Sequence, residues 1–310
     1  MRLPSLTTLL DITIGNEILG KWKWWDFVDG GDGCLYGIPF NARHVVKFNL
    51  LDNSFTEIGP DFGEFGRKWM CGVLDNIGNI YCAPYDAEHI LKIDTIQSTV
   101  ETLDDIELPE TGAGSSWNSG ALGADNNIYY MPFNARRIMK LNPDNDSLSS
   151  VGGDLGEGWK YRGTVVGNDD CLYGIPNQGY RIIKFDPTNP DTTSFVGEEH
   201  EFYTSESVLA DDGYVYAINH AGQVLKIDIS NGNYTWIGDP LYSDSGPYAD
   251  KGGTGQDGGG ATLLLELISA STGLHWMPIV YSSLIPRHNN CHHSWEMTWV
   301  KYISNGWVEL

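Results

Sequence analysis

One stretch of this chain recurs, with variations, at nearly constant spacing. Residues 127–142 read NIYYMPFNARRIMKLN, residues 34–49 read CLYGIPFNARHVVKFN, and further copies stand at 80–94 and 171–186. The tyrosines that anchor five copies lie at intervals of 45, 48, 44 and 43 residues: Tyr36, Tyr81, Tyr129, Tyr173 and Tyr216. Such a period is the signature of repeat architectures, in which each unit needs its neighbours to bury its apolar faces.

Every copy has the same order of short apolar segments. A run with a Trp or another aromatic residue is followed by an acidic turn, a strand ending in Pro, a short loop, a strand ending in Lys-apolar-Asp/Asn, and a strand ending in Ile/Val-Gly. These are four β segments without helical periodicity. Pro and Gly interrupt every stretch long enough for the helices of a helical solenoid. The pattern therefore predicts four-stranded antiparallel blades of a β-propeller.

The copies predict an all-β protein that forms a single β-propeller domain over residues 1–310 with six blades, and seven is the alternative count. A weaker sixth copy has His275 in the anchor place, 59 residues after Tyr216, and a Gly-rich inter-blade loop at 243–260 accounts for the excess. Residues 5–15 resemble a last strand, so we expect them to join the C-terminal blade and close the ring, although residues 279–310 follow the repeat poorly. The expected repeats are approximately 20–66, 67–112, 113–158, 159–204, 205–251 and 252–310.

The charge balance excludes some partners. The chain has 41 acidic and 19 basic residues, a formal net charge of −22, so nucleic acid or an anionic membrane surface would repel it. No apolar run approaches the roughly 20 residues of a membrane-spanning helix, and the N-terminus lacks a signal-peptide pattern. Cysteines without paired spacing favour reduced thiols. We expect a cytoplasmic monomer without membrane insertion.

The repeat resembles those of a known group of propellers. An acidic turn, [IL]-Y-x-x-P, a short loop and [VI]-[LIV]-K-[FI]-D are similar to repeats of the group that includes streptogramin lyases, SMP-30/gluconolactonase-like proteins, NHL and Kelch repeats. The resemblance covers residues 20 to 240 well and the remainder weakly, and the regular Gly-Gly pair of Kelch blades is missing. It implies the architecture and assigns no single family and no catalytic residue, since propellers host many functions.

Blade topology predicts which loops gather. The links between blades and the loops after the Pro-ending strands emerge on one face, and the acidic turns emerge on the other. The first face collects aromatic and basic residues, which suit a flat polar or sugar-like ligand, or the carboxylates of a protein partner. The residues expected to bind this ligand are Trp24, Asn41, Arg43, Trp69, Tyr85, Trp117, Asn134, Arg136, Tyr161, Gln178, Tyr180 and His220. The same loops hold Trp25, Phe40, Arg67, Lys68, Phe133, Trp159, Lys160, Arg162 and Asn177.

Structural roles are open for several of these residues. A Trp at each blade start can pack between neighbouring blades, and a loop Asn can adopt a left-handed turn conformation. The Lys of each Lys-apolar-Asp/Asn pair can lie on the solvent side of its strand.

The first functional hypothesis is a non-enzymatic recognition module that needs no cofactor and no metal. The alternative is a propeller-type lyase, lactonase or hydrolase with its site at the central funnel. Its candidate catalytic residues are His44, His89, Asp86 and Glu88, with Ca²⁺ or Mg²⁺ as a possible assistant. An enzyme should place one or two non-repeating polar residues with shifted pKa values in the funnel, whereas a scaffold should show a broad aromatic or charged rim.

Two further motifs have structural explanations. GTGQDG at 253–258 matches a dinucleotide-binding pattern but lacks the strand and helix that such a site needs. HNNCHH at 288–293 has zinc-ligand residue types but no partner pair elsewhere in the chain. We expect both to be surface segments.

Overall fold

The structure is a computed structural model, and it describes residues 10–12, 23–109, 116–177, 180–200, 203–219, 223–238, 276–283 and 294–301. All the regular elements in this part of the chain are β-strands. It contains no helix that is long and apolar enough to cross a membrane. Residues 243–260, GTGQDG at 253–258 and HNNCHH at 288–293 lie outside the described residues.

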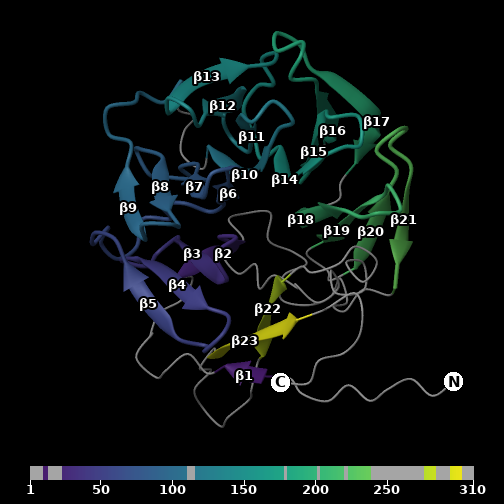
Figure 1. Ribbon diagram of the computed structural model, residues 1–310. Coiled ribbons are helices and arrows are strands. Elements are labelled where there is room, and N and C mark those ends of the chain that lie inside the picture. Colours follow the sequence, from purple (N-terminus) through teal and green to yellow (C-terminus); the bar gives the residue numbers. More distant parts are fainter. Residues whose placement is uncertain are drawn as a thin grey trace, which may run out of the picture.

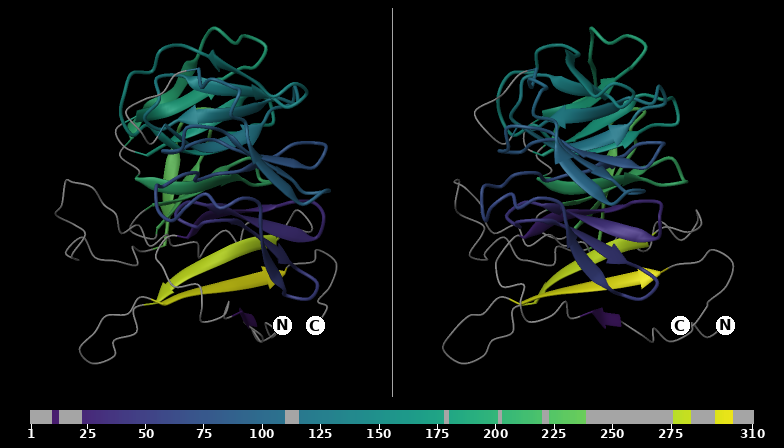
Figure 2. Two further views of the ribbon diagram at one scale, coloured as in Figure 1. Left: turned by 90° about the vertical axis from the view of Figure 1, so that its left-hand side faces the viewer. Right: turned by 60° about the vertical axis from the view of Figure 1, so that its left-hand side comes forward.

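Five antiparallel four-stranded sheets stand around a common axis (Figure 1), and Figure 2 shows them from the side. We call them blades one to five in chain order. Blade one is β2 (Trp24–Asp29), β3 (Cys34–Pro39), β4 (Val45–Asn49) and β5 (Phe55–Ile58); blade two is β6 (Val73–Leu74), β7 (Asn79–Cys82), β8 (Leu91–Asp94) and β9 (Thr99–Thr102). Blade three is β10 (Trp117–Leu122), β11 (Ile128–Pro132), β12 (Ile138–Asn142) and β13 (Ser147–Val151). Blade four is β14 (Tyr161–Val166), β15 (Leu172–Pro176), β16 (Tyr180–Phe185) and β17 (Ser194–His200); blade five is β18 (Thr204–Leu209), β19 (Val215–Asn219), β20 (Val224–Ile227) and β21 (Tyr234–Ile237).

A sixth sheet joins the two ends of the chain. It has the order β1 (Leu10–Ile12), β23 (Ser294–Lys301) and β22 (Trp276–Ser283), with three strands among the described residues. Leu10 lies opposite Trp299 in the antiparallel β1–β23 pair, which agrees with the N-terminal strand predicted from residues 5–15. The all-β propeller is thus confirmed, and closure of its ring stays a prediction.

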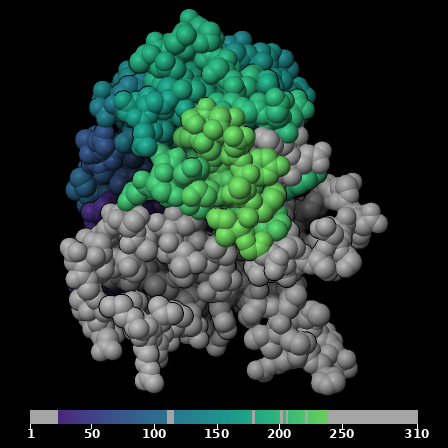
Figure 3. All heavy atoms as spheres, turned by 90° about the vertical axis from the view of Figure 1, so that its right-hand side faces the viewer, coloured from purple at the N-terminus to yellow at the C-terminus, as the bar shows by residue number. Residues whose placement is uncertain are grey.

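In each of blades one to five, the first strand lies innermost and the fourth outermost (Figure 1). The innermost strands of blades three, four and five contact one another in turn. The outermost β21 is exposed along its whole length, and Figure 3 shows blade five, in green, at the surface. First strands therefore stand around the central axis.

The repeated tyrosine and lysine lie directly opposite each other on the second and third strands. Tyr129 pairs with Lys140 in blade three, and the four other blades repeat this register. The Tyr129 hydroxyl donates to Asp125 Oδ2 over 2.7 Å, and Lys140 Nζ lies 3.5 Å from the same oxygen. An Asp four residues before the tyrosine completes the same trio in blades one, four and five. The acidic turns thus serve as anchors for Tyr and Lys.

Blade two obtains its acid from the next blade. Ile77 stands where the other blades have Asp, and the Tyr81 hydroxyl donates instead to Asp146 Oδ1 over 2.7 Å. Lys92 Nζ lies 2.8 Å from Asp146 Oδ2. Because Asp146 lies in the turn between β12 and β13, this trio crosses from blade two to blade three. The contacts of Tyr81 and Lys92 with Asp146 thus join blades two and three, and we call them the cross-blade lock.

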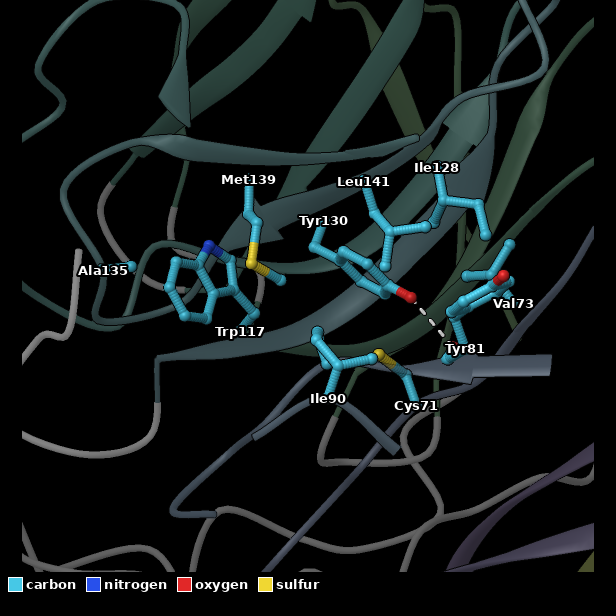
Figure 4. Close-up of a cluster of buried hydrophobic side chains, with 11 residues drawn as sticks. Cys71, Val73, Tyr81, Ile90, Trp117, Ile128, Tyr130, Ala135, Met139 and Leu141 are labelled. Atoms are coloured by element: carbon cyan, nitrogen blue, oxygen red, sulfur yellow. Dashed lines mark hydrogen bonds between the residues drawn. The ribbon is translucent and has the colours of Figure 1, made fainter. Parts of the chain in front are cut away.

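Apolar side chains fill the space between neighbouring blades. Figure 4 shows the cluster between blades two and three, in which Trp117, Tyr130 and Met139 pack beside Ile90 and Cys71. The buried Tyr130 hydroxyl donates to the backbone oxygen of Tyr81 over 2.8 Å, which joins the two blades through a second strand. Burial of these faces explains why the repeat keeps its aromatic anchors.

The cross-blade lock can be tested with Asp146→Asn. Asp146 has a φ of 54°, a left-handed conformation that Asn tolerates, so the change removes the charge without adding backbone strain. We expect the free energy of unfolding to fall by about 1 to 2 kcal/mol, because Lys92 and Tyr81 lose a charge-assisted acceptor. Urea denaturation measures this loss, with Asp144→Asn in the same turn as the matched control. Equal losses in both variants would contradict the lock.

Candidate functional site

The inter-blade links and the loops after the second strands meet on one face, which we call the link face. Phe40 N donates to Lys23 O over 3.0 Å, and Tyr85 N donates to Lys68 O over 2.8 Å. In later blades, Phe133 N and Asn177 N donate to the corresponding link residues. The residue after each Pro is therefore fixed beside the start of the first strand of its own blade.

Aromatic rings on the link face form a continuous arc across blades one to four. Ring centroids lie 5.0 Å apart for Trp25 and Phe40, 5.9 Å for Phe40 and Tyr85, and 6.2 Å for Tyr85 and Phe133. Phe133 then stacks on Trp159 at 5.9 Å with an interplanar angle of 11°. We call these five residues the aromatic arc. Trp159 ends the arc with 48% of its surface exposed.

Two arginines lie over the arc. The guanidinium carbon of Arg67 is 5.7 Å from the Tyr85 centroid, and that of Arg162 is 5.5 Å from the Phe133 centroid. Arg67 also pairs with Asp86, with 2.7 Å between Nη2 and Oδ2. The face thus combines aromatic rings with fixed cations, as cation–π contacts allow.

A β-bulge interrupts each first strand close to the link face. In blade three, Trp117 faces Pro132 but Ser119 faces Met131, which leaves Asn118 as the extra residue. The pairing in blade four makes Arg162 the extra residue in the same way. Bulges redirect side chains and occur often beside active sites.

In blade one, Trp24 faces Pro39 and Phe27 faces Gly37, so Trp25 and Asp26 lie between two successive pairs; in blade two, three residues lie between the paired Trp69 and Val73. Alignment on Trp24 and Trp69 gives Trp25 and Met70 the place that Asn118 and Arg162 have in the later blades. We call Trp25, Met70, Asn118 and Arg162 the bulge ring. In these four blades the preceding residue is a large aromatic, whereas the ring holds four chemically different side chains; blade five has Thr204 in place of the aromatic residue. In blades one to four the repeat thus keeps an aromatic residue for packing and varies at the next position.

Two buried amides of this region have unsatisfied atoms. Asn118 is 8% exposed, and neither its Nδ2 nor its Oδ1 has a hydrogen-bond partner in the part of the chain that the structure describes. Asn177 is 4% exposed, and its Oδ1 likewise has no partner among the described residues, while its Nδ2 donates to Trp159 O over 3.4 Å. Buried polar atoms are nearly always paired, so these three atoms make the region a candidate site.

Asp26 follows the bulge-ring residue of blade one. Its Oδ2 accepts the N–H of Gly72 from blade two over 3.1 Å, and its Oδ1 accepts the N–H of Phe27 over 2.8 Å. Burial raises the pKa of Asp26 to about 6, against the effect of these two hydrogen bonds. A carboxyl group that titrates near neutrality can exchange protons with a ligand.

Two lysines of the links are buried in cages of backbone oxygens. Lys68 Nζ donates to the oxygens of Gly63 and Phe65 over 3.1 and 3.0 Å. Lys160 Nζ donates to those of Gly156 and Gly158 over 2.8 and 3.2 Å. Burial, with a smaller contribution from a neighbouring cation, lowers the pKa of each lysine to about 8.

The three predicted tryptophans support the blades. The indole N–H of Trp24 donates to His44 O over 2.9 Å, that of Trp69 to His89 O over 2.9 Å, and that of Trp117 to Arg137 O over 3.3 Å. Trp69 and Trp117 are almost fully buried. Their side chains offer little surface to a ligand.

The predicted loop residues hold the links in place. Asn41 Oδ1 accepts the N–H of Arg67, and Asn134 Oδ1 accepts that of Gly158. Arg43 pairs with Asp61, and Arg136 pairs with Asp154 in the same way. These contacts position the link beside each loop.

The other predicted residues divide into three groups. Tyr85 belongs to the aromatic arc. Tyr161 is buried, with its ring centroid 6.2 Å from that of Tyr180, whose hydroxyl donates to Glu157 O over 3.4 Å. Gln178 and His220 lie outside the described residues.

The structure does not bring His44 and His89 together at the funnel. His44 Nδ1 lies 3.3 Å from Gly59 O at the end of its own fourth strand, and His89 Nε2 lies 3.9 Å from Asp104 in its own blade. Arg137 and Arg181 make the corresponding contacts with Gly152 and Gly197. The position thus forms a hydrogen-bonding ring on the outer half of the blades. Asp86 is paired with Arg67, and Glu88 is exposed.

Cysteines and metal ligands add no site within the described residues. Cys34, Cys71, Cys82 and Cys171 are buried free thiols. No group of three His, Cys, Asp or Glu side chains in the described ranges could hold a metal ion.

Comparison with known proteins shows the fold. No protein-family model and no curated protein matches the chain. A streptogramin B lyase structure matches at 17% identity with a TM-score of 0.57, covering 70% of this chain and 69% of that one. A catalytically inactive virginiamycin B lyase from Staphylococcus aureus with quinupristin matches at 17% identity and a TM-score of 0.58, covering 75% and 74%. The nidogen/laminin complex matches at 15% identity and a TM-score of 0.52, covering 68% and 78%. These matches confirm the predicted propeller and assign no family.

The sequence placed much of the aromatic arc on the correct face but missed the bulge ring as a unit. Trp25 and Arg162 were expected there only as link residues, and Met70, Asn118 and Asp26 were not expected at all. A signal was present, because aligning the copies on Trp24, Trp69, Trp117 and Tyr161 shows that the next residue varies.

The buried lysines predict a stability change at alkaline pH. In the unfolded chain the pKa of a lysine is about 10.4, whereas that of Lys160 in the folded chain is about 8. Between these two pH values, Lys160 therefore binds more protons in the unfolded chain than in the folded one. Stability therefore gains a contribution as pH rises through this window, of at most about 1.4 kcal/mol per pH unit. The difference in free energy of unfolding between wild type and Lys160→Met should increase from pH 7.5 to 9.5, by about 1 kcal/mol or more.

Lys184→Met is the matched control for this measurement. The hydrogen bond to Asp169 raises the pKa of Lys184, so its contribution is constant below the unfolded pKa and is lost above it. Denaturation in urea at several pH values should give a flat difference for Lys184→Met. A flat difference for Lys160→Met as well would contradict burial as the cause of a lowered pKa of Lys160.

Proposed function

We propose that this propeller is a recognition module that binds a small polar or sugar-like ligand on its link face, near the central axis. The observation that carries the proposal is the bulge ring, where a regular repeat holds four different side chains at one position of blades one to four. Packing between blades gives no reason for this variation. A ligand that contacts each blade differently does.

The aromatic arc supports the proposal. Phe133 and Trp159 stack, and Arg162 lies over the same Phe133 ring. Trp25, from the bulge ring, lies 5.0 Å from Phe40 at the other end. Arc and ring are therefore one surface, which offers flat apolar area beside hydrogen-bonding groups, as ligand sites do.

Binding can be tested with two similarly exposed tryptophans. Trp159 on the link face is 48% exposed, and Trp236 on the outermost strand of blade five is 41% exposed. A panel of oligosaccharides, aromatic carboxylic acids and lactones is screened by thermal shift against wild type, Trp159→Ala and Trp236→Ala. At least one compound class should raise the melting temperature of wild type, because ligand present at about 100 times its Kd stabilises the folded state by about 2.7 kcal/mol.

The shift should shrink in Trp159→Ala and persist in Trp236→Ala. Equal shifts in both variants would place the binding elsewhere on the protein. No shift of wild type with any compound would reject a small-ligand site and favour a protein partner.

The enzyme alternative is favoured by Asp26. This residue does not repeat in the other blades, and burial raises its pKa to about 6. The alternative would make Asp26 a general acid or base beside the bulge ring, in place of His44 and His89, with a lyase, lactonase or hydrolase reaction.

Asp26→Asn separates the two functions. If the protein is an enzyme, turnover of a lactone from the panel should fall at least about a hundredfold in this variant, and the wild-type rate should titrate near pH 6. A recognition module should keep its thermal shift with the bound compound and show no turnover in either form. Turnover that survives the substitution would exclude Asp26 as the catalytic group.

A further inference from the structure

The bulge ring has a polar half and an apolar half. Trp25 and Met70 belong to blades one and two, whereas Asn118 and Arg162 belong to blades three and four. The two polar residues thus lie on adjacent blades, and so do the two apolar ones. A ligand that satisfies the ring must itself be polar at one end and apolar at the other.

Asn118 defines what the polar end must contain. Both atoms of its amide are buried without a partner among the residues that the structure describes, so one hydrogen-bond acceptor for Nδ2 and one donor for Oδ1 are missing there. Only a group that presents an acceptor and a donor close together satisfies both. A carboxylate alone would leave Oδ1 unpaired at a cost in free energy.

Arg162 indicates a negative charge on the same end. Its guanidinium is always charged, and its position over Phe133 fixes it on the face where the ligand binds. A protein with a net charge of −22 repels anions in general. A cation fixed next to the Asn118 blade offsets that repulsion locally and pairs with a carboxylate.

The apolar half accepts the rest of the ligand. Met70 is 4% exposed, and Trp25 continues into the aromatic arc through Phe40. Methionine adapts its shape and makes favourable contacts with rings, and tryptophan offers a flat face. An aromatic or bulky aliphatic side chain fits this pair.

We propose that the bulge ring binds a small amphiphilic carboxylate that carries a hydrogen-bond donor on the carbon next to the carboxylate, and an aromatic or bulky apolar side chain. α-Hydroxy acids and α-amino acids share this chemistry. The carboxylate accepts from Arg162 and Asn118 Nδ2, the hydroxyl or ammonium donates to Asn118 Oδ1, and the side chain lies against Trp25 and Met70. The inference rests on the proposed function and names the ligand class for that site.

Titration calorimetry of the full chain with three acids tests the inference. Phenyllactate and phenylalanine carry the donor as hydroxyl and ammonium, and phenylpropionate lacks it. Wild type should bind one of the first two about tenfold more tightly than phenylpropionate, since the buried acceptor Asn118 Oδ1 is left unpaired in the latter complex. The one that binds more tightly identifies the donor as hydroxyl or ammonium.

Two variants assign the preference to residues. Asn118→Leu should remove the preference and bring all three affinities together. Arg162→Gln should weaken all three acids by about tenfold or more. Arg181→Gln is the matched control, because Arg181 also lies over a phenylalanine, Phe195, at 5.9 Å, but on the outer strands of its blade. Its affinities should equal those of wild type.

A measurement without ligand separates a binding role from a structural one. The Asn118 side chain makes no hydrogen bond within the described ranges of the chain, so Asn118→Leu should melt at the temperature of wild type or above it. A clear fall in melting temperature would assign Asn118 to the fold and overturn the inference. Equal binding of phenylpropionate, or a preference that survives in Asn118→Leu, would overturn it as well.

Failure of this inference differs from failure of the proposed function. If none of the three acids binds but an oligosaccharide gives a thermal shift that depends on Trp159, the link face binds a ligand of another class. If no compound in either experiment binds, both proposals fail.

Discussion

Burial between neighbouring blades is the constraint on which the rest of this structure depends. A single four-stranded sheet has two apolar faces, and one sheet alone cannot cover both. The cluster around Trp117 and Tyr130 solves this by drawing side chains from blades two and three together. Each blade therefore fixes its neighbour, and residues between blades have little freedom to change. Variation is possible only where a side chain leaves this packing, and the bulge next to Trp117 is such a place.

Most of the fold could be predicted from the sequence because its period is set by this packing. Tyr129 and Lys140 lie directly opposite each other on adjacent strands. The number of residues between the Tyr and the Lys of each copy therefore indicates the hairpin that joins the two strands. The acidic turn before Tyr129 could be recognised as a turn, but its role as an acceptor for both side chains needs the structure. In blade two the acceptor is Asp146, 65 residues after Tyr81, and no local pattern could have predicted it.

The site was harder to predict because the same residue types serve packing and binding. Trp24 and Trp25 are adjacent, yet the indole of Trp24 is tied to the backbone of His44 while the ring of Trp25 begins the aromatic arc. A bulge that every copy carries does not alter the repeat length, so alignment alone cannot reveal it. His44 and His89 were candidates because their side chains are reactive. Their place before the third strand turns them toward the outer strand instead, as the arginine at the same position shows.

The two faces of the propeller differ in how they treat charge. On the face of the acidic turns, the pKa of Asp169 is lowered to about 2, because hydrogen bonds from Lys184 and Tyr173 outweigh its partial burial. The link face has shifts of both signs. Ion pairs with Arg43 and Arg136 lower the pKa values of Asp61 and Asp154, whereas burial raises the pKa of Asp26 and lowers that of Lys160. Burying a charge costs free energy unless an opposite charge and hydrogen bonds offset it. Asp26 and Lys160 are therefore link-face groups whose burial disfavours their charged forms, and groups with such pKa shifts are candidates for a binding or catalytic role.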